Sequence, residues 1–184
     1  MKGLRLALGA RFHRRINRRP SSVVARTVPW LAVMLGSLLP GLLLVASAPV
    51  LPPLGFLTML AWRQLRPGLL PIWAGMPLGF FDDLYSGQPM GSAVLLWSLV
   101  MIILEAIETR FPWRSFALEW LLAAALILAY VAACLLTAHA AGGSAPFAVL
   151  APQAVLSVLI YPAIARVVAG LDRFRLIPFV ELGR

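Results

Sequence analysis

Few residues of this chain could do chemistry, and the acidic pair Asp82-Asp83 comes first among them. Two carboxylates can exchange protons with a substrate or hold a metal ion. Neighbouring residues of a helix differ by about 100° in direction, so only one of the two readily faces a helix bundle. No His and no third acid adjoins the pair in the sequence. A structural role is therefore favoured, and acid–base or metal chemistry is kept as the alternative.

Asp83 is predicted to brace the turn that follows it. An acid near a helix C-terminus opposes the helix dipole, so helix propensity does not explain its position. The turn contains Gly87 and Gly91, whose backbone N–H groups can bond to a carboxylate. We expect Asp83 to hold the connection between two helices in this way. The neighbouring Asp82 is expected to face water or lipid headgroups.

A second group of acids lies further along the chain. Glu105 and Glu108 are three residues apart and share one face of a helix. We expect them to form a cluster of salt bridges at the cytoplasmic interface, together with Arg110, Arg114 and Glu119. A docking patch for a cytoplasmic partner is the alternative interpretation.

Other reactive side chains give no recognisable site. One Cys and two His exclude a disulfide framework and a Cys/His metal cage. Ser86 and Ser92 have no adjacent base that would make them nucleophiles. No phosphate-binding loop, dinucleotide fingerprint or metal-ligand spacing is present. The sequence therefore predicts a protein that is not an enzyme, with no catalytic residue, no metal and no cofactor.

The composition indicates which elements must position these residues. Of the 184 residues, 61% are hydrophobic and 12% charged, and the mean hydropathy is +0.88. Soluble domains carry about 45–50% apolar and about 25% charged residues. A soluble enzyme and a disordered segment are therefore excluded. The chain is predicted to be an all-α, polytopic integral membrane protein of one domain.

Uncharged runs mark the membrane spans, because a spanning helix needs about 20 apolar residues. Three such runs have 36, 21 and 46 residues, and Pro-rich or Gly-rich turns divide the first and last of them. The second predicted helix is too short for a full crossing, so it is either a short span or one arm of a re-entrant pair with the third. In all, the pattern predicts a compact bundle of six helices, near residues 27–48, 53–66, 68–84, 91–109, 117–138 and 147–170.

The distribution of Lys and Arg favours six spans with both termini in the cytoplasm. The N-terminal segment, the turn after the second helix, the loop after the fourth and the C-terminal tail hold eight, two, two and four cations, which are all 16. The predicted outer loops hold none. We therefore divide the chain into a basic N-terminal tail (1–26), a six-helix transmembrane domain (27–171) and a short C-terminal tail (172–184).

The N-terminal tail has two interpretations. It is either a solvated topology signal or an amphipathic helix that lies on the anionic lipid of the inner leaflet. Apolar residues recur in it at a spacing of four, and basic residues stand between them. Nucleic-acid binding is not expected of it. The candidate lipid contacts are Arg5, Arg11, Arg14, Arg15, Arg18 and Arg19.

A longer motif runs from Leu51 to Glu108. It begins with a Pro before a short predicted helix, which ends in an aromatic residue and a turn of a basic residue and Pro. A second predicted helix that contains Gly follows. The motif ends with the sequence Asp-Leu-x-Ser-Gly-x-x-x-Gly. This pattern resembles the MreD family of bacterial rod-shape-determining proteins. Asp82 departs from it, because the family usually has an apolar residue there, and the basic tail is longer than usual. The matching residues are Pro53, Pro67, Gly79, Asp83, Gly87 and Gly91, with Pro162 in what resembles the family's last helix.

The resemblance implies a non-enzymatic component of the bacterial inner membrane that helps to elongate the cell wall. Its partners would be MreC, the actin-like MreB, and the glycosyltransferase and transpeptidase that build peptidoglycan. The family is also similar in fold to the six-helix substrate-binding subunits of vitamin transporters. A small-molecule uptake subunit is therefore the alternative. Such a subunit needs polar side chains at the membrane midplane, and four of the predicted helices offer few, which favours a scaffold. These few are Ser98, Gln153 and Ser157.

Overall fold

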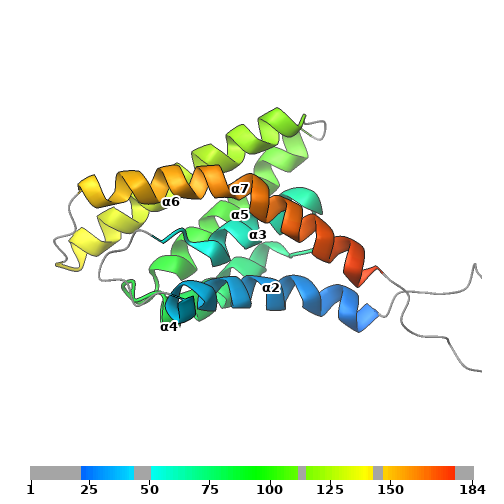
Figure 1. The fold of residues 1–184 in the computed structure, drawn as a ribbon, viewed down its shortest axis with the longest axis horizontal. Coiled ribbons are helices and arrows are strands. Elements are labelled where there is room, and N and C mark those ends of the chain that lie inside the picture. Colours follow the sequence, from blue (N-terminus) through cyan, green and yellow to red (C-terminus); the bar gives the residue numbers. More distant parts are fainter. Residues whose placement is uncertain (1–21, 44–50, 112–114, 143–146, 177–184) are drawn as a thin grey trace, which may run out of the picture.

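A computed structural model describes residues 22–43, 51–111, 115–142 and 147–176 (Figure 1). Within these ranges every regular element is a helix, which confirms the all-α class. The elements are α2 (Ser22–Leu43), α3 (Leu54–Leu65), η1 (Ile72–Ala74), α4 (Gly75–Tyr85), α5 (Ser92–Arg110), α6 (Phe116–Ala140) and α7 (Phe147–Arg175).

Four of the described helices, α2, α5, α6 and α7, are long and apolar enough to cross a membrane. With 12 and 11 residues, α3 and α4 are shorter. At 1.5 Å per residue they reach only about 18 Å and about 16 Å, well below the ~30 Å hydrocarbon core. The protein is therefore a multi-pass membrane protein, and the count of six spans stays a prediction.

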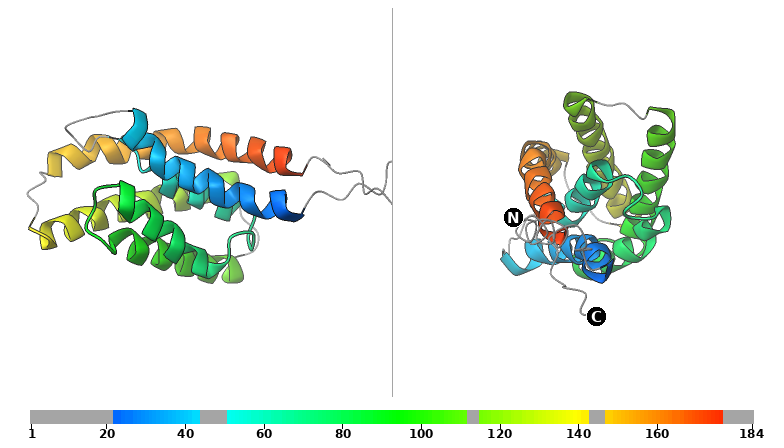
Figure 2. Two further views of the ribbon diagram at one scale, coloured as in Figure 1. Left: turned by 90° about the horizontal axis from the view of Figure 1, so that it is seen from below. Right: turned by 90° about the vertical axis from the view of Figure 1, so that its right-hand side faces the viewer.

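The short helix α3 lies at the centre of the bundle, with the other helices around it (Figure 2). Nine of its twelve residues are buried. Phe56 of α3 stacks on Tyr130 of α6 with ring centroids 4.0 Å apart, and lies 6.1 Å from Trp97 of α5. Because long helices cover it, α3 has little contact with lipid and need not match the membrane thickness.

Small residues let the helices meet closely at two places. Where α2 crosses α3, a Cβ added to Gly36 would lie 3.1 Å from the Cα of Gly55. Where α4 crosses α5, a Cβ added to Gly79 would lie 2.6 Å from the carbonyl oxygen of Ala93. A Cβ added to Gly75, one turn earlier on α4, would lie 2.9 Å from backbone atoms of α5. This Gly-x-x-x-Gly spacing is typical of closely packed membrane helices.

Several helix boundaries differ from the prediction. The first helix already begins at Ser22, and the last continues to Arg175. The proposed tail boundaries after residues 26 and 171 therefore fall inside α2 and α7. An uncharged run marks the part of a helix that suits hydrocarbon, whereas the helix itself continues into the interface. Residues 44–48 of the first predicted helix lie outside the described residues.

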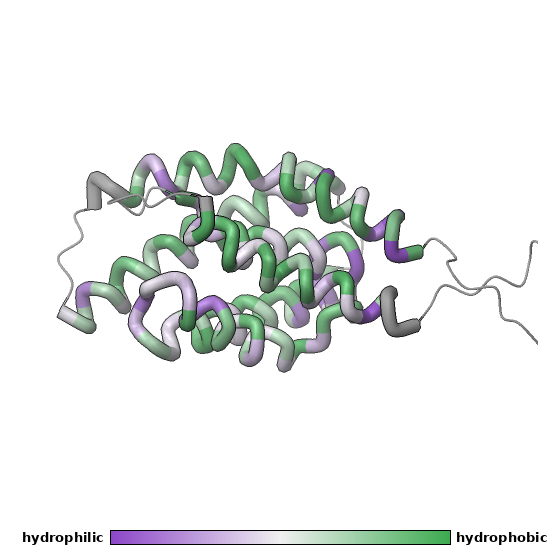
Figure 3. The backbone as a smooth tube through the Cα atoms, turned by 60° about the horizontal axis from the view of Figure 1, so that its bottom comes forward, coloured by the Kyte–Doolittle hydropathy of each residue, from purple (hydrophilic) through white to green (hydrophobic). Residues whose placement is uncertain are grey.

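Hydropathy varies along the bundle in the way a membrane requires (Figure 3). Hydrophobic residues cover most of each long helix, and hydrophilic ones gather toward the helix ends. Large apolar side chains are exposed on the outward faces, and lipid would cover them. Examples are Leu35, Leu95, Leu121 and Leu159.

Candidate functional site

Asp83 joins the end of α4 to the start of α5. Its Oδ2 accepts hydrogen bonds from the backbone N–H groups of Gly91 (2.9 Å) and Val94 (3.3 Å). Its Oδ1 accepts from the N–H of Ala93 (2.9 Å) and the hydroxyl of Ser92 (3.3 Å). The first N–H groups of a helix have no acceptor within the helix, and its N-terminus favours a negative charge. These hydrogen bonds are of the kind that the sequence predicted for Asp83.

The turn between α4 and α5 depends on two glycines. Gly87 and Gly91 have φ angles of +69° and +90°, in the left-handed region that other residues rarely adopt. Gly91 is also the N-cap of α5, and its N–H points to Asp83. The chain can therefore reverse within a few residues and return the start of α5 to the carboxylate.

The expectation for Asp82 was wrong. Its side chain is not in water or among headgroups, because only 6% of the residue is exposed. Helix α4 packs against both α2 and α5, so its two adjacent acids each meet protein. Asp83 meets the start of α5, and Asp82 lies beside Ser37 of α2.

Asp82 lines a cavity of about 540 Å³. Parts of α2, α3, α4, α6 and α7 form its walls, together with residues 51–53 and 86–89. Gln153 of α7 lies in the wall and donates a hydrogen bond from Nε2 to the carbonyl oxygen of Leu51 (2.9 Å). The polar lining residues include Ser37, Asp82, Ser86, Gln88, Tyr130, Cys134 and Gln153.

Arg63 forms the first of two groups of ion pairs near the other end of α3. It is 1% exposed and pairs with Glu105 and with Glu108, the latter at 2.9 Å. Its Nη1 also donates to the carbonyl oxygen of Leu70 (3.3 Å). These contacts connect the C-terminal turn of α3 to α5.

Glu105 and Glu108 both pair with Arg63, a partner that the sequence did not indicate, and Arg110 is exposed at the end of α5. The predicted cluster with Arg110, Arg114 and Glu119 stays a prediction, because Arg114 lies outside the described residues. Sequence reasoning assigned Arg63 to a cytoplasmic turn and missed this role. One signal could have revealed it. Arg63 follows Phe56 and Met59 at helical spacing, and that face is buried.

The second group of ion pairs joins three helix ends. Asp172 of α7 pairs with Arg66, which follows α3, at 3.0 Å, and with Arg175 at 2.7 Å. Arg175 also donates to the carbonyl oxygen of Ala25 in α2 (3.0 Å) and lies 5.8 Å from the ring centroid of Trp62. The start of α2, the end of α3 and the end of α7 are thus held together.

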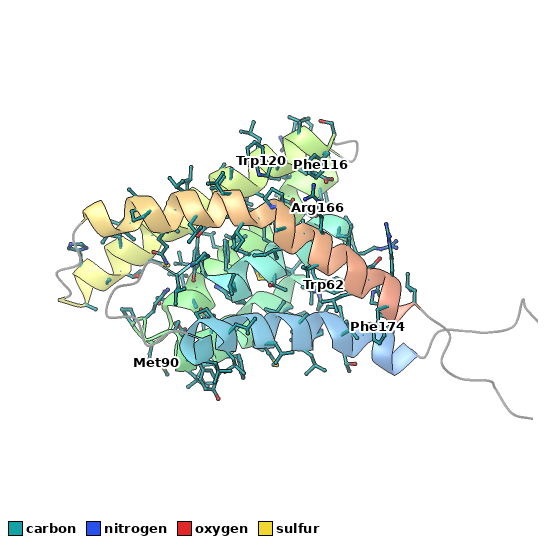
Figure 4. The ribbon with its side chains drawn as sticks, in the orientation of Figure 1. Trp62, Met90, Phe116, Trp120, Arg166 and Phe174 are labelled. Atoms are coloured by element: carbon teal, nitrogen blue, oxygen red, sulfur yellow. The ribbon has the colours of Figure 1, made fainter. Side chains whose placement is uncertain are left out.

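A smaller hollow of about 230 Å³ lies between the start of α6 and the middle of α7. Phe116, Trp120 and Arg166 lie close together there (Figure 4). Gln64 of α3 lines its floor and accepts a hydrogen bond from the hydroxyl of Tyr161 (2.9 Å). The hollow combines aromatic, apolar and charged side chains, which is typical of a membrane interface.

Comparison with protein-family models matches residues 24–175 to the rod shape-determining protein MreD. The chain belongs to the MreD family. The match covers most of the chain and includes the Asp83 hydrogen bonds, the cavity and both groups of ion pairs. The recognition made from the sequence motif is therefore confirmed. Searches of curated proteins and of solved structures find no match.

The remaining candidate residues of this MreD-family chain are dispersed. Pro53 is the N-cap of α3, Pro67 lies in the turn after α3, and Gly79 packs on α5. Pro162 lies inside α7 and lines the smaller hollow. Arg114 and the six candidate lipid contacts between residues 5 and 19 lie outside the described residues. Among the described residues, no group of three or more His, Cys, Asp or Glu side chains could hold a metal ion.

Proposed function

We propose that this protein is a non-enzymatic scaffold in the bacterial cell inner membrane. It links peptidoglycan synthesis to the actin-like cytoskeleton through MreC, MreB, and the glycosyltransferase and transpeptidase of the cell wall. Membership of the MreD family gives a role in the determination of rod shape.

One observation carries the scaffold interpretation: the main charged side chains of the described bundle bind other helices of the same chain. Arg63 binds α5, Asp83 binds the start of α5, and Asp172 binds the turn after α3. These contacts between helices fix the shape of the bundle. The exposed apolar faces of the long helices then offer surface for partner helices, which associate by close packing in lipid.

The scaffold is tested in rod-shaped cells depleted of their own MreD. Expression of the full chain is expected to restore rod shape, and a tag on it should capture MreC after extraction in mild detergent. An unrelated single-span inner-membrane protein serves as the control and should not be captured. Restored shape without capture of MreC would refute the link through MreC, and rounded cells despite normal abundance would refute the role in elongation.

The proposed orientation has both termini in the cytoplasm. The start of α2 and the end of α7 lie at the same end of the bundle (Figure 1), as do the ion pairs of Arg63 and Arg66. Reporter fusions after residues 50, 88 and 142 should report an outer location. Fusions after residues 66, 114 and 184 should report an inner one.

The fusions after residues 66 and 88 decide whether α3 and α4 cross the membrane. Opposite locations are expected from six spans, because the chain then passes from inside to outside between them. The same location for both would make α3 and α4 a re-entrant pair and reduce the number of spans to four.

A second candidate function is a membrane-embedded binding subunit of a small-molecule uptake transporter. The cavity of about 540 Å³ favours it, because such a volume suits a small ligand. Genomic neighbourhood distinguishes the two candidates. If the gene for this protein lies next to the gene for MreC, the scaffold is supported. If it lies next to the gene for an energising ATPase, the transporter is supported.

A further inference from the structure

Asp82 and Asp83 differ in how their carboxylates are used. Asp83 accepts four hydrogen bonds from residues 91–94 and has little capacity left for a ligand. Asp82 is equally buried, but its neighbours are the hydroxyl of Ser37 and the carboxylate of Asp83. No Lys or Arg in the described part of the chain forms an ion pair with it. A buried carboxylate without a counter-charge is strongly unfavourable.

A second buried polar group lies in the same cavity wall. Ser37 is 7% exposed, and its hydroxyl has no hydrogen-bond partner of good geometry. Both Ser37 and Asp82 line the cavity, so a ligand within it can reach both. Tyr130, whose ring stacks on Phe56, also lines this space.

The surroundings restrict what the ligand can be. An anion would be repelled by two adjacent carboxylates. A divalent metal ion needs several oxygen ligands, and the nearest additional carboxylate, Asp83, is bonded to α5. Much of the remaining lining is apolar, including Pro40, Leu54, Val131, Leu135 and Leu150. An organic cation with an apolar part fits these conditions.

We propose that the cavity beside Asp82 binds an amine, whose ammonium group pairs with the Asp82 carboxylate while its apolar part contacts the surrounding prolines and leucines. The amine is either the headgroup of an aminophospholipid or a free small molecule. The volume of about 540 Å³ lies within the range of small-molecule sites, roughly 300–1,000 Å³. The site does not depend on the scaffold function, because it uses no residue of a partner.

The test uses the full chain in nanodiscs of phosphatidylglycerol, with the temperature of unfolding as the readout. Phosphatidylethanolamine tests the lipid source, and N-acetylated phosphatidylethanolamine, in which a neutral amide replaces the ammonium group, is its counterpart without a cation. Benzylamine tests the free amine, and benzyl alcohol is its uncharged counterpart. At least one amine should stabilise the protein, and its counterpart without an ammonium group should not. Asp82→Asn should weaken binding of that amine about tenfold or more, as expected for the loss of a charge-assisted hydrogen bond.

Glu119→Gln is the matched control, because it removes one carboxylate from the smaller hollow and should leave amine binding unchanged. If Asp82→Asn does not accumulate, Ala138→Phe tests the same site by filling the cavity, and it should abolish the stabilisation. Stabilisation by phosphatidylethanolamine alone assigns a lipid, and stabilisation by benzylamine alone assigns a free amine. The proposal would be overturned if neither amine stabilised the protein, or if each amine and its counterpart without an ammonium group had equal effects. Unchanged amine binding in both variants would overturn it as well.

Discussion

Replacement of Arg63 by methionine is expected to destabilise the bundle by about 3–5 kcal/mol, the usual cost of removing one partner of a buried ion pair. Methionine fills a similar space but leaves Glu105 and Glu108 without the cation that now contacts both. Glu108 is 10% exposed, so water cannot readily replace Arg63 there. The measurement is the unfolding temperature of the purified protein in detergent, together with its abundance in the membrane.

Arg110→Met is the matched control, because Arg110 is exposed at the end of α5 and its loss should change stability by less than about 0.5 kcal/mol. Adding Glu108→Gln to Arg63→Met removes one buried charge and should restore part of the lost stability. If the double variant loses as much stability as Arg63→Met and Glu108→Gln lose in sum, the broken ion pair is not the cause of the loss.

Asp83→Leu is expected to have the second-largest effect. It removes the acceptor for the backbone N–H groups of Gly91 and Ala93, and each buried donor left without a partner costs about 1–3 kcal/mol. Asp83→Asn keeps one of the two acceptor oxygens and should lose less stability, about 1 kcal/mol. Membrane abundance and unfolding temperature should therefore fall in the order wild type, Asp83→Asn, Asp83→Leu.

The same change one residue earlier provides the control. Asp82→Asn removes a buried carboxylate that forms no ion pair within the described part of the chain, so without an added amine it should be neutral or stabilising. Loss of cell shape in Asp83→Asn with normal abundance would contradict a purely structural Asp83. Its negative charge would then be needed for ion binding or proton transfer.

The local part of the fold could be predicted from the sequence. Uncharged runs and turn residues located the six α-helices of the described residues, because both signals lie within a few residues of the features they define. The Asp83 hydrogen bonds could be predicted for the same reason, since donor and acceptor lie within 11 residues of each other.

Contacts between distant segments could not be predicted in this way. The ion-pair partners of Arg63 lie 42 or more residues away, so no local spacing indicates them. Hydrophobic periodicity shows that α3 has a buried face, but not that other helices surround it. The burial of Asp82 likewise depends on α2, which packs against α4 from a distant part of the sequence.

The contacts of α3 also bear on the order in which the protein is assembled during synthesis. Arg66 leaves the ribosome 106 residues before Asp172, its partner at the far end of the last helix. Arg63 likewise enters the membrane before α5, which supplies its acidic partners. The nascent chain must therefore keep these arginines at the lipid surface or beside the insertion machinery until the later helices arrive. A product that stops before α7 leaves Arg66 without Asp172, so the end of α3 lacks the contact that holds it to the last helix.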